Sequence, residues 1–335
     1  MRELLHPKNM GMERYIDVVK GVCILLVVLF HYQWSETIKK YFLFAFWFDM
    51  AVPVFMIVSG YVYSRMFERR GICRLSDAFE LVFLLKRALR FIVPFTMYYA
   101  VHLIVICVLD PGGVGVLSAV AGYFEGGFGP GSFYFPVMLQ FLILFPLVYF
   151  LVRKYGQSGF AACILITAAL EMLKTLAGMD AETYRLLAFR YIAVIACGSL
   201  IAQKGFRPSP FFCLAATVIG FAYTWLTGYA GIVLWSLEYW TSTSYAASFP
   251  VMALMMYAIP SVRLGCRPLE VLGKASFDIM LAQMLVYYSF AEGIYAAVSE
   301  PLLQIMICAL LGVAGGLALY AAEFRITRRL VRCLR

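Results

Sequence analysis

The chain has 335 residues, of which 63% are apolar and only 14% are charged. A water-soluble protein of this size needs more polar surface, so the composition predicts a protein that lies mostly in lipid. The formal charge of +9 is not gathered in a basic soluble domain, and we therefore predict no nucleic-acid partner.

Apolar stretches long enough to cross a bilayer, roughly 20 residues each, recur along the whole sequence. In chain order they cover 15–34, 42–64, 88–109, 132–152, 158–176, 185–203, 209–227, 245–262, 269–291 and 301–322. We therefore predict an all-α, polytopic membrane protein with about ten transmembrane helices. No second domain is indicated, so residues 1–335 form one membrane-embedded domain.

The orientation follows from the basic residues, because cytoplasmic loops of membrane proteins carry the excess of Lys and Arg. With the N-terminus inside, 23 of the 28 basic residues fall on the cytoplasmic side. The five on the other side are Lys39, Lys40, Lys174, Arg185 and Arg190. This asymmetry predicts a multi-pass protein of the inner (plasma) membrane with both termini in the cytoplasm.

The first predicted span carries unusual polar residues, namely Arg14, Asp17, Lys20 and His31. At 100° per residue, Lys20 and His31 share nearly one azimuth of a helix, about 16 Å apart along its axis. Asp17 lies within about 40° of the same direction. We predict one interior seam that runs from Lys20 at the inner interface to His31 in the outer half.

Polar residues inside lipid are expensive and therefore functional candidates. A neutral imidazole at His31 can accept the proton of a hydroxyl group as that group attacks an acyl carbonyl. The alternative is a histidine that is only hydrogen-bonded within the bundle, and the alignment with Lys20 favours catalysis.

Three connecting segments stand out. Residues 65–87 form a basic cytoplasmic loop, in which we predict a short helix on the membrane surface. Residues 110–131 form a glycine-rich outer loop, too irregular to face lipid. The outer segment 228–244 carries aromatic residues, Trp240 among them, which can hold a sugar ring or form an ordinary interfacial belt.

The nine cysteines include no CxxC pair, and none lies in a predicted outer loop. We therefore predict neither a disulfide framework nor a metal site, and interpret the cysteines as small apolar residues.

Five segments together resemble the acyltransferase-3 family. The first is a basic residue followed by ten residues and a histidine, here Lys20 to His31, with Arg14 and Asp17 before it. The others, in order, are PVFMIVSGY at 53–61, KRALRFIVP at 86–94, YFPVMLQFLILFPL at 134–147 and LGKASFDIMLAQ at 272–283. Each piece alone is weakly specific, but the five occur in the family's order over nearly the whole membrane region.

The resemblance implies a bacterial membrane-bound O-acyltransferase. Such an enzyme passes an acyl group, usually acetyl, from cytoplasmic acetyl-CoA to a hydroxyl of a cell-surface polysaccharide or lipid-linked sugar. His31 would be the catalytic base, assisted by Lys20 and Asp17. Arg87 and Arg90 would hold the phosphates of CoA.

Guanidinium groups suit such phosphates, and the same resemblance places Arg14 in the CoA site. Paired arginines at a cytoplasmic helix end are also ordinary membrane anchors, so CoA binding is the test of Arg87 and Arg90.

We predict that Ser59, Gln140, Gln283 and Trp240 contact the acceptor. Ser59, before Gly60, is better explained as a small residue at a helix contact. Many family members carry an acidic residue at the position of Pro53 and a histidine at that of Gln283. These departures leave the acceptor and the acyl chain open.

The alternative function is a transporter or exporter of a polysaccharide or a small polar substrate. Ten spans, aromatic outer loops and buried charges fit it in a general way. Stabilisation by acetyl-CoA discriminates, because only the enzyme needs this ligand.

Overall fold

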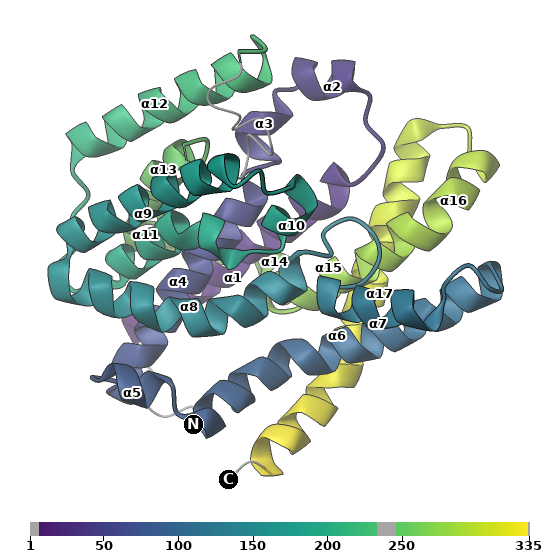
Figure 1. Cartoon of the computed structure of the whole chain (residues 1–335), viewed down its shortest axis with the longest axis horizontal. Coiled ribbons are helices and arrows are strands. Elements are labelled where there is room, and N and C mark those ends of the chain that lie inside the picture. The colour runs from purple at the N-terminus through teal and green to yellow at the C-terminus, as the bar shows by residue number, and fades with distance from the viewer. Residues whose placement is uncertain (1–6, 233–245, 334–335) are drawn as a thin grey trace.

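The computed structural model describes residues 7–232 and 246–333, and the side chains from residue 14 onward. This part of the chain contains helices and no strand, which confirms the predicted all-α class. Most long helices lie side by side, while α6 and α17 cross at one flank and α12 lies at an edge (Figure 1).

The longer helices form the bundle. They are α1 (Pro7–Phe30), α4 (Ala51–Arg70), α6 (Leu81–Leu109), α8 (Tyr134–Tyr155), α9 (Gln157–Leu176), α11 (Ile192–Ala202), α12 (Pro210–Gly228), α13 (Phe249–Ser261), α15 (Ser276–Leu285) and α17 (Pro301–Cys333). The shorter elements are α2 (Glu36–Tyr41), α3 (Phe44–Trp47), α5 (Leu75–Ala78), α7 (Val116–Glu125), α10 (Ala181–Arg185), η1 (Ala188–Tyr191), α14 (Arg267–Lys274), η2 (Val286–Phe290) and α16 (Ala291–Ala297).

In the described part of the chain, six stretches are long and apolar enough to cross a membrane. They are Phe44–Arg70, Leu75–Leu109, Tyr134–Tyr155, Gln157–Leu176, Pro210–Gly228 and Pro301–Cys333. The other predicted spans also fall on helices, namely α1, α11, α13 and, for 269–291, the run from α14 through α15 to η2. The protein is therefore a membrane protein, and the count of ten and the orientation stay predictions.

The basic segment predicted as a loop over 65–87 is mostly helical. Helix α4 continues to Arg70, since arginine is a good helix former, and stops at Gly71 with φ of 65°. The four-residue helix α5 follows, and α6 begins at Leu81. The predicted short helix is present, and its place on the membrane surface stays a prediction.

The glycine-rich segment predicted as a loop over 110–131 contains a helix as well. Helix α7 is tied to α6 by the Tyr99 hydroxyl, which donates to the carbonyl of Ala119 at 2.5 Å. The chain then turns back through Gly126, whose φ is 93° and whose added Cβ would collide with the carbonyl of Ser132. The irregular parts are thus residues 110–115 and 126–133, and the second of these brings Gly131 next to His31 and Gln283.

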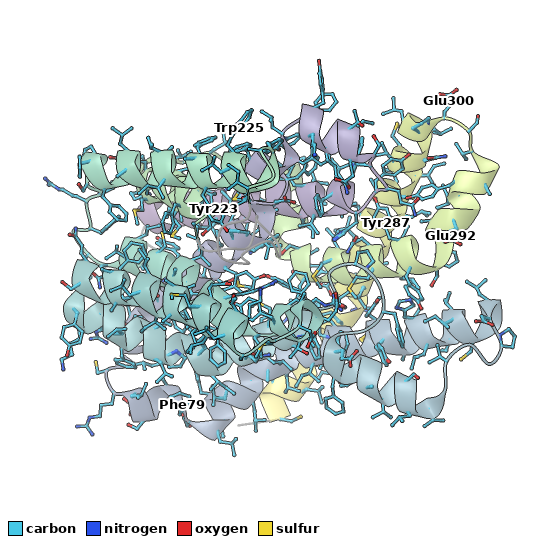
Figure 2. The ribbon with its side chains drawn as sticks, turned by 45° about the horizontal axis from the view of Figure 1, so that its top comes forward. Phe79, Tyr223, Trp225, Tyr287, Glu292 and Glu300 are labelled. Carbon is cyan, nitrogen blue, oxygen red and sulfur yellow. The ribbon has the colours of Figure 1, made fainter. Side chains whose placement is uncertain are left out.

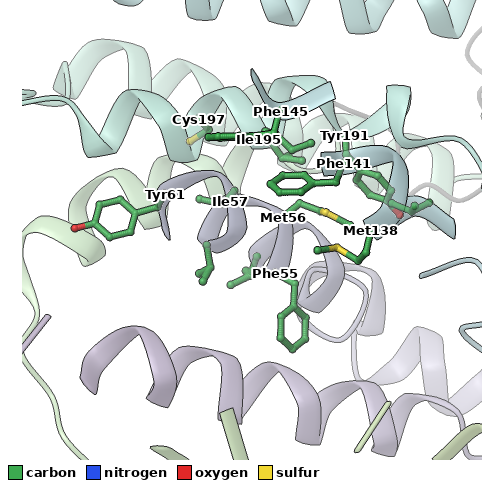
Figure 3. Packing of buried hydrophobic residues seen from close by; sticks show 14 of the residues in the cluster. Phe55, Met56, Ile57, Tyr61, Met138, Phe141, Phe145, Tyr191, Ile195 and Cys197 are labelled. Atoms are coloured by element: carbon green, nitrogen blue, oxygen red, sulfur yellow. The ribbon is translucent and has the colours of Figure 1, made fainter. Parts of the chain in front are cut away.

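Helix α4 is the centre of the core. Gly60 on α4 lies against the backbone of Ile195 on α11, and Gly198 on α11 lies against that of Ile57, so the two helices approach closely. Figure 3 shows Phe141 and Phe145 gathered on one side of α4 while Phe55 points away from them. The side to which Phe55 points faces α1 and encloses a cavity.

Candidate active site

A cavity of about 770 Å³, counted to its open mouth, lies between the end of α1, the start of α4 and α15. Most of its wall is apolar. Its four polar side chains are His31, Asp49, Tyr134 and Ser276. Gly131 of the glycine-rich loop also lines it, so segments far apart in the sequence meet here.

His31 is the first residue after α1, and its ring lines this cavity. The ring lies edge-on to Phe30, with centroids 5.7 Å apart, and 6.2 Å from the Tyr287 ring. Tyr287 belongs to the π-helical turn η2 and donates its hydroxyl hydrogen to the carbonyl of Val28 at 2.8 Å, which fixes this wall. The imidazole therefore faces the protein interior and not lipid, as predicted.

The Nδ1 atom of His31 is buried and has no hydrogen-bond partner among the described residues. The side chain of Gln283 and the carbonyl of Val27 approach the ring. Buried polar atoms normally have partners, so Nδ1 is an exception, and it belongs to a side chain that lines the cavity.

Gln283 holds the glycine-rich loop over His31. Its Nε2 donates to the carbonyl of Pro130 at 3.1 Å, and its Oε1 is buried without a partner in the described chain. A Cβ added to Gly131 would lie 3.6 Å from Gln283 Nε2 and 3.7 Å from His31 Cε1. The structure thus brings one predicted acceptor residue, Gln283, next to the predicted base.

Asp49 is the site residue that sequence reasoning missed. It lies in the turn between α3 and α4, and its carboxylate lines the same cavity as His31. Its position is four residues before Pro53, where many family members have an acidic residue. Because Asp49 lies in a turn before α4, helical spacing does not predict it, and only the nearness of an acidic residue to Pro53 could have pointed to it.

The predicted cations do not line the cavity. Lys20 pairs with Asp17 at 2.7 Å, and Arg14 pairs with Glu270 on α14 at 2.9 Å. The cavity reaches down α1 only as far as Ile24, about one turn from Lys20. This cavity therefore does not extend to Lys20, and of the three predicted catalytic residues only His31 lines it.

The two arginines of α6 lie beyond an aromatic floor. Arg87 lies 5.7 Å from the ring centre of Tyr63, while Arg90 is exposed. Phe277 lines the cavity and packs edge-on against Phe91, the residue after Arg90, with centroids 5.3 Å apart. Packed rings thus lie between the arginines and His31. The helical wheel of α1 does not predict these rings, because they belong to neighbouring helices.

The remaining predicted acceptor residues lie elsewhere. Gln140 donates to the carbonyl of Leu186 at 2.6 Å and accepts from the backbone N–H of Ala188 at 3.0 Å, so both ends of its amide hold the chain before α11. Ser59 lies beside the close contact of Gly60 with α11 and does not line the cavity. Trp240 lies outside the described residues.

Two other buried polar side chains, Glu171 and Lys174, both contact Tyr184. The Tyr184 hydroxyl donates to Glu171 at 2.6 Å, and the Lys174 ammonium lies 5.1 Å from the Tyr184 ring centre. No three His, Cys, Asp or Glu side chains gather as a metal site within the described ranges.

Comparison with known proteins gives one positive result. Neither the curated proteins nor the solved structures contain a match. A family model described as an acyltransferase domain matches residues 13–321, which include the whole cavity wall. It covers nearly the full length, and the resemblance carried by Lys20 to His31 is confirmed: the chain belongs to the acyltransferase-3 family.

Proposed function

We propose that this acyltransferase moves an acetyl group from cytoplasmic acetyl-CoA to a hydroxyl of an extracytoplasmic polysaccharide or lipid-linked glycan in the inner membrane. The observation that carries the proposal is the position of His31, which lines a largely apolar cavity and whose Nδ1 has no hydrogen-bond partner in the described chain. We assign the α2 end of the bundle to the outside and the α5 end to the cytoplasm.

His31 acts as the general base. As the acceptor oxygen attacks the thioester carbonyl carbon, the imidazole takes the hydroxyl proton. The carbon–sulfur bond of the resulting tetrahedral adduct then breaks, and the imidazolium returns the proton to the departing sulfur of CoA. The apolar wall supports this sequence because water, the competing nucleophile, is largely excluded.

Asp49 assists from the same cavity. Its carboxylate accepts a hydrogen bond from a second hydroxyl of the acceptor and so orients it. Its negative charge also stabilises the imidazolium that forms at His31.

Arg87 and Arg90 receive the phosphates of CoA at the α5 end. Arg87 is held between the rings of Tyr63 and Phe83, and Arg90 is free to reach into the solvent. Planar guanidinium groups suit phosphate. The pantetheine arm must pass the rings of Phe277 and Tyr63, so we propose that CoA binding turns these rings aside.

The test is acetyl transfer by membranes that contain the protein, with radiolabelled acetyl-CoA and the native glycan. His31→Ala should lower transfer by roughly 100-fold or more, the usual contribution of a general base. Acetyl-CoA should still stabilise the purified variant against heat, which shows that it is folded. Unchanged transfer by His31→Ala would exclude this function, and absence of any acetyl-CoA stabilisation of the wild type would favour the transporter.

A further inference from the structure

A second hollow lies on the other side of the α3–α4 segment, between this segment, α12 and α13. We call it the lateral groove, and its empty space is about 1450 Å³, counted to its open side. Its wall, as far as the structure describes it, consists of Ala45, Phe46, Trp47, Met50, Ala51, Val54, Pro210, Cys213, Leu214, Thr217, Phe221, Thr224, Ala247, Pro250, Val251, Ala253, Leu254 and Tyr257. Helix α12 lies at an edge of the bundle (Figure 1), and its residues line one side of the groove.

The chemistry of this wall suits hydrocarbon. Nearly all of its side chains are apolar. The Thr217 hydroxyl donates to the carbonyl of Cys213 on its own helix, at 2.7 Å, and so needs no hydrogen-bond acceptor in the groove. A polar ligand would lose its hydration here without replacement hydrogen bonds. The occupant is therefore a lipid tail.

The length of the groove indicates which kind of tail. The lateral groove and a smaller hollow that shares Phe46 and Phe221 with it follow α12 from Pro210 to Leu226. At about 1.5 Å per residue this is about 24 Å, whereas one leaflet of the hydrocarbon core is only about 15 Å deep. A phospholipid tail stays within one leaflet, so the groove fits a longer chain of the polyprenyl type.

Aromatic rings close the α2 end of the groove. Phe46 stacks on Phe221 and Tyr229, with centroids 4.9 Å and 5.6 Å away, and Trp225 stacks on Tyr229 at 5.3 Å. Figure 2 shows Trp225 at the edge of α12. Such rings lie at the boundary of lipid and water, which places the headgroup of the occupant at this end.

Two lysines supply the matching charge. Helix α2 packs on α3 and carries Lys39, which pairs with Glu36 at 2.8 Å, and Lys40, for which the described chain shows no partner. They are two of only five basic residues predicted on the outer side. Because the positive-inside rule disfavours cations here, a pair of them beside the groove points to an anionic headgroup such as a phosphate.

The groove and the His31 cavity share one wall. Phe48 and Asp49 face the cavity, while the adjacent Trp47 and Met50 face the groove. Lys39 is close enough to Asp49 to interact with its charge. A headgroup held at α2 therefore lies beside the mouth through which the acceptor must reach His31.

We propose that the acceptor is a sugar carried on the phosphate of a polyprenyl lipid, with its tail in the lateral groove and its phosphate at Lys39 and Lys40. The sugar then reaches Asp49 and His31. The identity of this lipid as acceptor rests on the proposed function, whereas its binding does not.

The experiment is photo-crosslinking of the full-length protein in phosphatidylethanolamine vesicles. The probe is undecaprenyl phosphate with a diazirine in its tail, and the comparison is phosphatidylglycerol with the same diazirine. We expect the first probe to label α12 and α13 at least fivefold more than the second. Equal labelling by the two probes would mean an ordinary lipid contact and would overturn the proposal.

Substitutions in and beside the groove test whether the probe binds there. Thr217→Trp fills the groove and should lower labelling at least fivefold, whereas Val218→Trp, on the exposed side of α12, should leave it unchanged. The double variant Lys39→Gln, Lys40→Gln lies on the exposed helix α2. It should weaken labelling by the undecaprenyl phosphate probe and leave labelling by the phosphatidylglycerol probe unchanged. It serves as the test if Thr217→Trp does not fold, and full labelling of the double variant would overturn the headgroup assignment.

The two proposals fail separately. His31→Ala should be labelled like the wild type although it transfers no acetyl group. Groove labelling without any acetyl transfer by the wild type would overturn the proposed function alone. Loss of selective labelling with transfer to a soluble glycan retained would overturn this inference alone.

Discussion

The two ends of α1 differ in how their polar groups are satisfied. At the lower end, Lys20 pairs with Asp17 and Arg14 pairs with Glu270. At the upper end, His31 Nδ1 and Gln283 Oε1 are buried and have no partner in the described chain. Buried groups without partners are destabilising, so a protein keeps them where a ligand completes them. This difference supports the proposed role of His31, for which the two ion pairs at the other end of α1 are not needed.

Among the substitutions that compare the two ends of α1, Asp49→Asn should lower acetyl transfer most. Loss of a charge-assisted hydrogen bond, about 1.5–3 kcal/mol, should lower kcat for acetyl transfer roughly 10-fold to 100-fold. The thermal shift produced by acetyl-CoA should not change, because Asp49 is far from the arginines. A variant with normal kcat would remove Asp49 from the site.

Gln283→Leu tests the loop above the base. The substitution leaves the carbonyl of Pro130 without its donor, at about 1–3 kcal/mol, and loosens Gly131 over His31. We expect roughly tenfold weaker transfer with a raised KM for the acceptor and an unchanged KM for acetyl-CoA. A rise confined to the acetyl-CoA KM would contradict the assignment of this end to the acceptor.

Arg90→Ala probes the opposite end. An exposed arginine that binds a phosphate contributes less than a buried one, so we expect about fivefold weaker binding of CoA, measured by thermal shift. Lys86→Ala on the same turn is the matched control and should bind CoA normally. Equal binding by both variants and the wild type would reduce Arg90 to a membrane anchor.

Lys20→Ala should have the smallest effect. Its ion pair with Asp17 is partly screened by solvent and contributes about 1 kcal/mol at most. We expect a lower melting temperature and acetyl transfer within about threefold of the wild type, with the double variant Asp17→Ala, Lys20→Ala no worse. A loss comparable to that of His31→Ala would restore the catalytic role that the resemblance implies for Lys20.

The sequence predicts those features that depend on one helix at a time. Long apolar runs locate the helices, and a lone imidazole after such a run locates His31. Asp49 escapes this reasoning because it lies in a turn, where no periodicity applies. The contact of Gln283 with Pro130 joins residues 153 positions apart, and the barrier at Phe277 comes from another helix than α1.

The most direct measurement uses sealed vesicles that hold the protein in one orientation. Radiolabelled acetyl-CoA is supplied only on the side of α5, and the glycan acceptor only on the side of α2. We predict acetylated glycan with the wild type and none above background with His31→Ala. Acetylation by both proteins, or acetylation only when donor and acceptor share one side, would contradict transfer through the His31 cavity.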